Sequence, residues 1–274
     1  MDESKRLLLR SVAHCIRSDV IEMTYMAGRN GAHIGGGLSM CEILATLYFA
    51  VMNIDSRRPL SENRDRFILS KGHGALALYS VLKQAGFLTQ EDLNGFKRDG
   101  TDFWTHPRFM PEKGIEYASG SLGMGLSLGG GTALALKHKG LSARVYVYVG
   151  DGECDEGAIW EAASFISHHK LDNVTVIVDE NKLQLDAPTK NIINKDNLGE
   201  RWGSFGFHVV NADGHDVCDL MKAFAYRSSD RPVAIIARTV KGKGVSFAEN
   251  NPIFHMNTLN EEQYKIAKKE QEMQ

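Results

Sequence analysis

The sequence Arg144-Val-Tyr-Val-Tyr-Val149, followed directly by Gly150-Asp-Gly152, decides the fold class of this chain. Its β-branched and aromatic residues are typical of a buried strand, and the glycines end it in a tight turn. A helix is predicted over 156–168, and a second apolar strand over 174–178 ends at Asp179-Glu-Asn181. Strand, helix and strand in this order form a βαβ unit, whose strands are parallel and whose crossover is right-handed.

The alternation of strands and helices continues on both sides of this unit. Further strands are expected at 66–70, 207–211 and 233–239. Helices are expected at 5–27, 40–52, 75–85, 90–97, 124–139 and 216–227, with a glycine-rich loop before residue 40. The chain is expected to finish in a charged, mobile helix or tail at 260–274. This pattern predicts an α/β, doubly wound fold with a mostly parallel sheet flanked by helices. We find no internal repeat and no linker rich in proline or serine, so we expect a single domain over residues 1–274.

Two local features carry more specific expectations. Ser39 stands where an N-cap is expected for the helix over 40–52, with Glu42 as its capping-box partner. The run Gly129-Gly-Gly131 lies inside a predicted helix, where each glycine costs about 1 kcal/mol relative to alanine. Because this cost needs a reason, we expect a close contact of the helix at this point, either within the chain or between subunits.

Composition excludes several classes of protein. The chain has 274 residues, 43% apolar and 24% charged, which is ordinary for a globular protein and unlike a disordered, collagen-like or coiled-coil chain. Its formal charge of −2 offers no electrostatic footprint for nucleic acid or for an anionic membrane surface. No run of apolar residues is long enough to span a membrane, and none forms a signal peptide. The cysteines, which form no CxxC pair, are expected to be reduced thiols in the cytoplasm; they are Cys15, Cys41, Cys154 and Cys218.

The ends of the two central strands are the candidate ligand site. In open parallel sheets ligands bind outside the carboxyl ends of the strands, which is where Asp151 and Asn181 are expected. Adjacent strands lie about 4.8 Å apart, so oxygens of both side chains can reach one hard cation such as Mg²⁺. The helix that opens near Glu156 turns its positive end to the same place, which suits a diphosphate, and Gly150 and Gly152 allow the backbone to come close. Gly150-Asp-Gly152 alone also fits a tight turn, and Asn181 alone also fits an ordinary strand end. Together they predict a metal-diphosphate site.

These motifs carry a resemblance to a known family. Gly150-Asp-Gly-Glu-Cys-Asp-Glu-Gly157, running on to Asp179-Glu-Asn181, resembles the thiamine diphosphate signature, which begins with Gly-Asp-Gly and ends with an Asn further along the chain. Within that superfamily the chain is similar to transketolase over almost its whole length, in the N-terminal, diphosphate-binding (PP-type) portion. Three further stretches share this resemblance: Arg64 to His73 beside the diphosphate, Thr105-His-Pro107 in the donor-sugar channel, and Gly120-Ser-Leu-Gly-Met-Gly125 along the cofactor rings.

The resemblance implies a role for each matched position. Mg²⁺ or Ca²⁺ would be bound by Asp151, Asn181 and the carbonyl of Leu183. The residues implied around thiamine diphosphate are His73, Gly150, Gly152, Lys241 and His255 at the diphosphate end, Gly120, Ser121 and Leu122 along the rings, and Glu156, which in the family helps to link two cofactor sites of a dimer. The implied catalytic residues are His33, His73, His106 and His255, with His33 and His106 facing the C1 and C2 oxygens of the sugar.

The activity implied is transfer of a two-carbon ketol unit from a ketose or ketose phosphate to an aldose, in carbohydrate metabolism of the pentose phosphate type. A donor hydroxyl must lose a proton and a carbon–carbon bond must break, while the thiazolium of the cofactor serves as electron sink. Histidine suits the proton transfers because its unperturbed pKa is about 6.5. Without the family resemblance, each of these histidines would be explained at least as well by a structural hydrogen bond.

The sequence departs from the family at a few positions and in length. The positions are Ile34, where Pro is common after His; Gly37, near which relatives often have Ser; Arg108, where an acidic residue is frequent; and Met256, in place of Gly. The chain also ends before the pyrimidine domain, which in the family holds the glutamate that protonates the aminopyrimidine. We therefore expect a split enzyme, an α₂β₂ heterotetramer in which this chain is active only when paired with a separate C-terminal subunit.

Two alternatives stay open from the sequence. A chain of a 2-oxo acid dehydrogenase (E1-type), or of a deoxyxylulose-phosphate synthase-like enzyme, would share the Gly-Asp-Gly and Asn site. Ser70-Lys-Gly-His73 and Thr105-His-Pro107 favour transketolase over the dehydrogenases. The other alternative is a non-catalytic cofactor-binding or regulatory protein.

Overall fold

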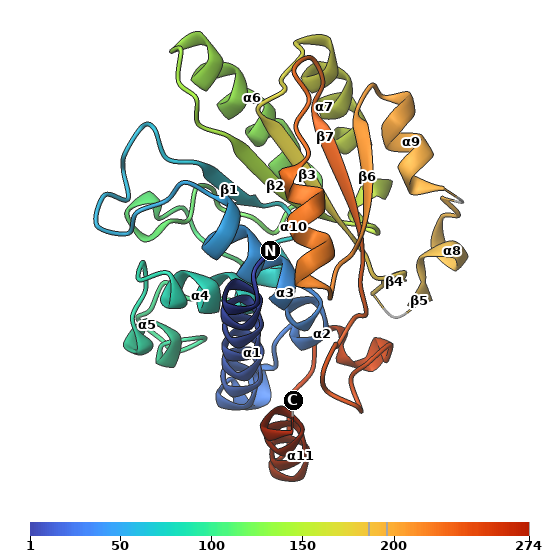
Figure 1. Ribbon diagram of the computed structural model, residues 1–274. Coiled ribbons are helices and arrows are strands. Elements are labelled where there is room, and N and C mark those ends of the chain that lie inside the picture. The colour runs from blue at the N-terminus through green and yellow to red at the C-terminus, as the bar shows by residue number, and fades with distance from the viewer. Residues whose placement is uncertain (186, 196, 274) are drawn as a thin grey trace.

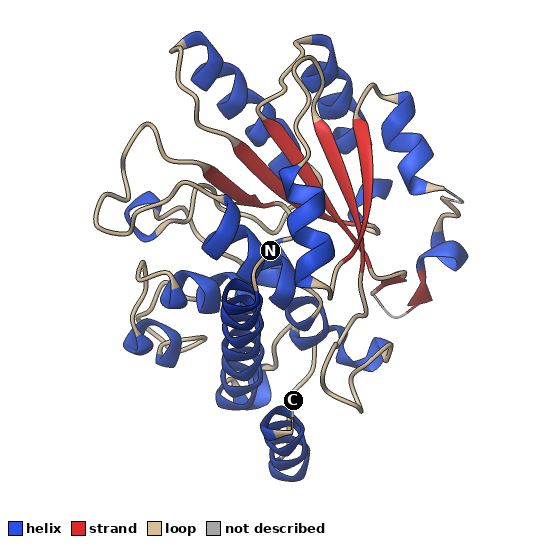
Figure 2. Ribbon diagram, viewed as in Figure 1, coloured by secondary structure: helices blue, strands red, loops and turns tan. Residues whose placement is uncertain are grey.

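A five-stranded parallel sheet forms the centre of the computed structural model, which describes residues 1–185, 187–195 and 197–273 (Figures 1 and 2). Its strands are β1 (Arg66–Leu69), β2 (Val145–Gly150), β3 (Val174–Glu180), β6 (His208–Asp213) and β7 (Val233–Arg238), in the spatial order β1-β2-β3-β7-β6. Each neighbouring pair is parallel. The five strands predicted from the sequence are present, and the predicted doubly wound α/β class is confirmed.

Helices surround this sheet, and most of them agree with the prediction. They are α1 (Glu3–Met26), α2 (Ile34–Leu38), α3 (Cys41–Thr46), α4 (Ala75–Gln84), α5 (Gln90–Asn94), α6 (Met124–His138), α7 (Gly157–His168), α8 (Thr189–Ile192), α9 (Leu198–Ser204), α10 (Val217–Ala225) and α11 (Glu261–Glu272). A π-helical turn, Leu47–Val51, continues α3, and a small hairpin joins β4 (Leu183–Gln184) to β5 (Ala187–Pro188). The sequence did not predict α2, α8, α9 or the hairpin, which are short and lie in polar or glycine-rich segments.

Alternate residues of each strand face two separate hydrophobic cores. Tyr146 and Tyr148 of β2 pack into the core formed with α1, α3, α4 and α10, whereas Val145, Val147 and Val149 pack into the core formed with α6, α7 and α9. Successive side chains of a strand point to opposite faces, so a strand covered on both faces has a continuous apolar sequence. Figure 2 shows this arrangement, with helices on both sides of the strands.

The start of α3 differs from the prediction. Met40, and not Ser39, is the N-cap residue, and no side chain caps this helix. Because the chain is already helical over α2, Ser39 lies in the interior, where its hydroxyl donates to the Asp179 carboxylate at 2.7 Å. Glu42 closes no capping box and instead lies 2.9 Å from a ring nitrogen of His215.

The contact predicted at the glycine run of α6 is formed within the chain. A Cβ added to Gly129 would lie 2.4 Å from Val147 of β2, and one added to Gly130 would lie 2.9 Å from Ile166 of α7. Gly131 faces open space. The close approach at the first two glycines is therefore intramolecular, and it explains why a helix tolerates them.

The C-terminal helix predicted from the charged sequence is present and packs against α1. Its mobility stays a prediction. The ring of Tyr264 in α11 stacks on Tyr25 of α1 with 4.1 Å between centroids, and its hydroxyl donates to Glu22. A capping box between Asn260 and Gln263 closes the start of α11. Residue 274, the last of the predicted helix, lies outside the described residues.

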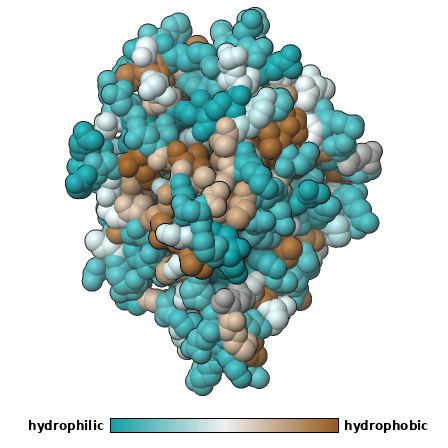
Figure 3. Space-filling view, viewed as in Figure 1, coloured by the Kyte–Doolittle hydropathy of each residue, from teal (hydrophilic) through white to brown (hydrophobic). Residues whose placement is uncertain are grey.

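Among residues 1–185, 187–195 and 197–273, no helix combines the length and the apolar character needed to cross a membrane. The face shown in Figure 3 is mostly hydrophilic, with smaller hydrophobic areas near its centre. The four cysteines are free.

Candidate active site

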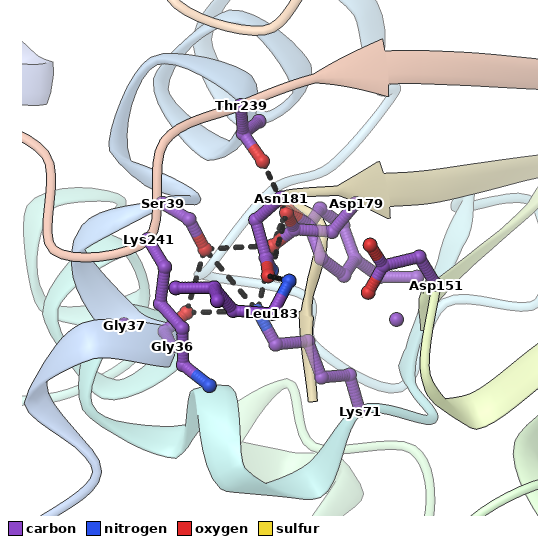
Figure 4. Close-up of polar contacts among 12 residues, drawn as sticks. Gly36, Gly37, Ser39, Lys71, Asp151, Asp179, Asn181, Leu183, Thr239 and Lys241 are labelled. Carbon is purple, nitrogen blue, oxygen red and sulfur yellow. Dashed lines mark hydrogen bonds and ion pairs between the residues drawn. The ribbon is translucent and has the colours of Figure 1, made fainter. Parts of the chain in front are cut away.

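Asp151 and Asn181 meet at the carboxyl edge of the sheet (Figure 4). Asp151 follows β2 and Asn181 follows β3, and these strands are parallel neighbours in which Gly150 lies opposite Asp179. The Asp151 N–H donates to the Asp179 carbonyl at 3.1 Å, which extends the pairing by one residue. The strand register therefore brings together two residues that are distant in the sequence, as predicted.

The side chains of this pair present hard oxygen atoms. The Asp151 carboxylate accepts hydrogen bonds from the Gly152 N–H at 2.7 Å and the Lys182 N–H at 2.6 Å. Burial, together with the nearby charge of Asp179, raises the pKa of Asp151 to about 7. The amide oxygen of Asn181 accepts from the Leu183 N–H at 3.0 Å. Among the described residues no three His, Cys, Asp or Glu side chains form a metal-binding group, so a cation here would rely on carboxylate, amide, carbonyl and ligand oxygens.

Behind this pair lies a buried polar network that the sequence analysis missed. The Lys71 ammonium group pairs with the Asp179 carboxylate at 2.6 Å, and both side chains are almost completely buried. The carboxylate also accepts hydrogen bonds from Ser39, Tyr148, Asn181 and Thr239. Burial alone would raise the pKa of Asp179, but the Lys71 charge and these hydrogen bonds hold it well below its usual range. Lys71 stands beside His73 in the motif that carried the resemblance, yet nothing in the sequence showed that it is buried.

The four predicted histidines form one cluster. The ring centroid of His33 lies 5.6 Å from His73, 5.6 Å from His106 and 5.2 Å from His255, and His73 lies 5.3 Å from His255. A ring nitrogen of His255 lies 3.0 Å from the Lys241 ammonium group. These residues come from four separate segments: the residue before α2, the turn after β1, the loop after α5 and the turn at 252–255.

The environment of this cluster favours neutral imidazoles. Burial lowers the pKa of His33 to about 3, and the neighbouring His255 and His106 add to the effect. Burial and the Lys71 charge lower the pKa of His73, and burial and Lys97 lower that of His106. At neutral pH such imidazoles can each accept or donate a hydrogen bond without carrying a charge.

A cavity of about 230 Å³ lies between the strand ends and the histidine cluster. The predicted residues that line it are His73, Leu122, Gly150, Asp151, Gly152, Glu156, Asn181, Leu183, Lys241 and His255, and the lining is completed by Lys71, Glu153, Gln184 and Leu185, which were not predicted. Glu156 is the N-cap residue of α7, so that helix begins beside the cavity. Ten predicted residues therefore surround one space, although the role of each remains a prediction.

Four predicted residues lie outside this lining. His33 and His106 contact it through the histidine cluster, with His33 in ring contact with His73 and His255. Gly120 and Ser121 are exposed on the loop that precedes α6. The backbone of Gly120 lies against His106, because an added Cβ would be 3.2 Å from that ring.

Glu153 and Gln184 hold the Gly-Asp-Gly turn in place. The buried Glu153 carboxylate accepts hydrogen bonds from the Ser70 hydroxyl and from the backbone N–H groups of Gly123 and Gly150. The side chain of Gln184 packs over Gly152, where an added Cβ would be only 2.8 Å away. Glycine at 152 is therefore required by the approach of the hairpin, whereas an added Cβ at Gly150 would meet only ordinary contacts.

None of the four positions that depart from the family lines the cavity. Ile34 is completely buried, and Met256 is 48% exposed. Arg108 is exposed and pairs with Asp102 at 3.2 Å. The glycine that faces His73 is Gly36, where an added Cβ would lie 3.0 Å from the ring, so a larger residue there would displace the imidazole.

The fold and the cavity define an α/β protein with its ligand site at the carboxyl edge of a parallel sheet. The family described as transketolase, thiamine diphosphate binding domain, matches residues 10–274, and the chain belongs to this family. The 6-deoxy-6-sulfo-D-fructose transketolase subunit SqwG of Clostridium sp. (strain MSTE9) is 42% identical over 237 residues, covering 86% of each chain. An apulose-4-phosphate transketolase subunit of Phocaeicola vulgatus is 38% identical over 258 residues, covering 93% of this chain and 90% of its own.

Solved structures agree with this assignment. A transketolase structure from Leishmania mexicana has a TM-score of 0.89 and 31% sequence identity, and the match covers 96% of this chain and 41% of that one. This chain thus corresponds to the N-terminal part of a transketolase, a transferase that moves a ketol unit, and in extent it matches the relatives that are named as subunits. The predicted family, enzyme class and thiamine diphosphate-binding fold are confirmed.

Proposed function

We propose that this chain is the cofactor-binding subunit of a two-component transketolase that moves a two-carbon ketol unit from a ketose, or ketose phosphate, to an aldose. One observation supports this more than any other: His73, His255 and Lys241 line one cavity with Asp151 and Asn181. His33 and His106 extend this site through the histidine cluster. A site of this kind combines oxygen ligands for a cation, the Lys241 ammonium group for a diphosphate and neutral imidazoles for a sugar.

The residues present fit a diphosphate bound through a divalent cation. We assign Mg²⁺, or Ca²⁺, to Asp151, Asn181 and the Leu183 carbonyl, because hard cations prefer oxygen ligands of these types. Lys71 neutralises Asp179, so Asp151 supplies the negative charge of the set. We assign the diphosphate to His73, Gly150, Gly152, Lys241 and His255, the cofactor rings to Gly120, Ser121 and Leu122, and a link between cofactor sites to Glu156.

Two buried polar atoms support a polar ligand in this place. Within the described residues, Nδ1 of His33 and Oε1 of Gln184 have no hydrogen-bond partner. Buried polar atoms are nearly always hydrogen-bonded, so each such exception needs a reason. A bound cofactor and sugar would provide these two atoms with partners.

The chemistry divides between the cofactor and this chain. Thiamine diphosphate, when bound, supplies the electron sink for breaking a carbon–carbon bond beside a carbonyl. The residues of this chain bind and orient the ketose. Its histidines form hydrogen bonds with the hydroxyl groups of the sugar and accept or return their protons. His33, which burial keeps neutral, can accept a hydrogen bond from a sugar hydroxyl, and His106 places a second imidazole at the same sugar oxygens.

The named relatives support a proposal for the partner and the substrate class. Those covered almost end to end are named as transketolase subunits, and we propose a second subunit with the pyrimidine domain here also, in an α₂β₂ assembly in the cytoplasm. The names of these relatives refer to 6-deoxy-6-sulfo-D-fructose and apulose 4-phosphate, which are ketoses with an anionic group. We propose a ketose or ketose phosphate donor for this chain, with no nucleic acid or membrane partner.

The test is a transfer assay on the reconstituted complex. The chain is co-expressed with the adjacent open reading frame, purified, loaded with thiamine diphosphate and Mg²⁺, and supplied with ketose donors or with 2-oxo acids. We expect ketol transfer from a ketose, lost in Asp151→Asn and retained in the control His168→Asn at the end of α7. Decarboxylation of 2-oxo acids without ketol transfer would place the chain with the dehydrogenase or deoxyxylulose-phosphate synthase-like enzymes. Cofactor binding without either reaction would indicate a non-catalytic protein.

A further inference from the structure

The side chain of Lys97, in the loop after α5, extends to the loop that carries His33. Its ammonium group donates to the carbonyls of Asn30 and Gly31, at 2.8 and 2.7 Å. These carbonyls lie two and three residues before His33. Two of the three N–H donors of the lysine are therefore used to hold the approach to that histidine.

The backbone of Lys97 is tied to the loop that carries His106. Its N–H donates to the carbonyl of Phe103 at 2.8 Å, which closes the turn leading to His106. In this turn Lys97 has φ = 57°, a conformation that a residue with a side chain keeps only where its surroundings impose it. Phe103 is buried in the core, so the turn is anchored and the lysine side chain extends from a fixed base.

The loop before His33 is held from its other side as well. Ala32 and Asn257 form an antiparallel bridge with N···O distances of 2.9 and 3.0 Å. A Cβ added to Gly31 would lie 3.2 Å from the backbone of Asn257. Lys97 and the segment after His255 therefore clamp this loop between them.

The Lys97 ammonium group is also a fixed positive charge close to both imidazoles. Burial lowers the pKa of His106, and the charge of Lys97 lowers it further. For His33 burial is the main cause, and Lys97 acts in the same direction after the neighbouring histidines. Both effects favour uncharged imidazoles.

We infer that Lys97 is a positioning residue for recognition of the donor sugar: it joins the two loops and fixes the spacing of His33 and His106, whose ring centroids are 5.6 Å apart. This inference rests on the proposed function, which assigns these histidines to the donor oxygens. Lys97 acts through the histidines and not on the reacting atoms. Loss of its ammonium group should therefore loosen the sugar end of the site and leave the Asp151 and Asn181 end unchanged.

The kinetic test compares Lys97→Met and Lys97→Arg in the reconstituted complex. Lys97→Met should raise KM for the ketose donor about tenfold, change kcat less than about twofold, and leave the Kd of thiamine diphosphate unaltered. Lys97→Arg should recover most of the donor KM, because guanidinium keeps the charge and several N–H donors. Lys137→Met is the matched control: Lys137 also donates to a loop carbonyl, that of Lys170 at 3.0 Å, but from α6 and outside the cavity lining. It should leave all three constants unchanged.

Hydrogen exchange on the full chain provides a readout that needs no catalysis. In Lys97→Met, backbone amides at 28–34 and 99–106 should exchange faster than in the wild type, and those at 150–157 should not. Unchanged exchange in both loops overturns the inference, and so does a fall in kcat and cofactor affinity at constant donor KM. A wild-type complex without ketol transfer refutes the proposed function instead, and the exchange result still decides the role of Lys97.

Discussion

At the scale of single residues, the buried pair of Lys71 and Asp179 controls the orientation of Asn181. A carboxylate can only accept hydrogen bonds, so the Asn181 amide must turn its NH₂ group toward Asp179, at 3.1 Å. Its oxygen is left to accept from the N–H of Leu183, at 3.0 Å, a residue that lines the cavity. The buried ion pair of Lys71 and Asp179 thereby determines which atom Asn181 offers to the cavity.

We expect Lys71→Met to destabilise the chain by about 3–5 kcal/mol, because it leaves the buried Asp179 carboxylate without its cation. Urea denaturation measures this loss. The double variant Lys71→Met, Asp179→Asn should recover part of it, since the stranded charge is removed. The exposed pair Lys265 and Glu261 serves as control, and Lys265→Met should have no measurable effect. A stable Lys71→Met variant would show that the pair is not buried as described.

The neutral state of His33 predicts that acid weakens the apo chain. In the unfolded chain a histidine takes up a proton below a pH of about 6.5, whereas burial lowers the pKa of folded His33 to about 3. The stability contributed by His33 is therefore complete above pH 6.5 and declines as the pH falls toward 3. Between pH 7 and 5 the wild type should lose about 1–2 kcal/mol more than His33→Asn, as measured by urea denaturation. Equal losses in both proteins would contradict this.

At the scale of elements, the glycine run of α6 contains two kinds of position: glycines that pack against β2 or α7, and a glycine that packs against nothing. Gly129 and Gly130 allow close approach to Val147 and Ile166, whereas Gly131 faces solvent and contributes no packing. The first two glycines are therefore packing residues, and the third only lowers helix stability.

Two substitutions in α6 should therefore have opposite signs. Gly129→Ala should destabilise by about 1–3 kcal/mol, because its Cβ overlaps Val147. Gly131→Ala should stabilise by about 0.5–1 kcal/mol, since it improves helix propensity in open space. Thermal denaturation of both variants in parallel tests this, each serving as the control for the other. Destabilisation by Gly131→Ala would indicate that another surface covers that face of α6.

At the scale of the whole molecule, the sheet and its loops bring segments from residue 71 to residue 255 around one cavity. The two cores hold the strand ends rigid, and the site is built on loops that leave this scaffold. Ligands that bind only such an assembled site should stabilise the fold as a whole.

Thiamine diphosphate with Mg²⁺, at about 100 times its Kd, should therefore stabilise the chain by about 2.7 kcal/mol. The rise in melting temperature measures it, and removal of the metal with EDTA should abolish it. Asp151→Asn should show no rise, whereas Asp172→Asn, in the turn before β3 and outside the cavity lining, should behave as the wild type. A full rise in the presence of EDTA would refute the proposed cation site.

The order of residues along the chain was enough to establish the fold class and the placing of Asp151 and Asn181 at strand ends. Those features depend on local patterns, since an apolar run of strand length, a glycine turn and a helical period can each be recognised within a few residues. The roles of the histidines came from family resemblance, because no local pattern distinguishes a ligand-binding histidine from one in a structural hydrogen bond.

Folding in three dimensions was needed to show that His33, His73, His106 and His255 form one cluster, that Lys71 is buried against Asp179, and that Lys97 joins two loops. These contacts link residues that are far apart in the sequence, so no periodicity reports them. A lysine in the sequence is most often at the surface, and only the packing of distant elements around it shows that it is held inside.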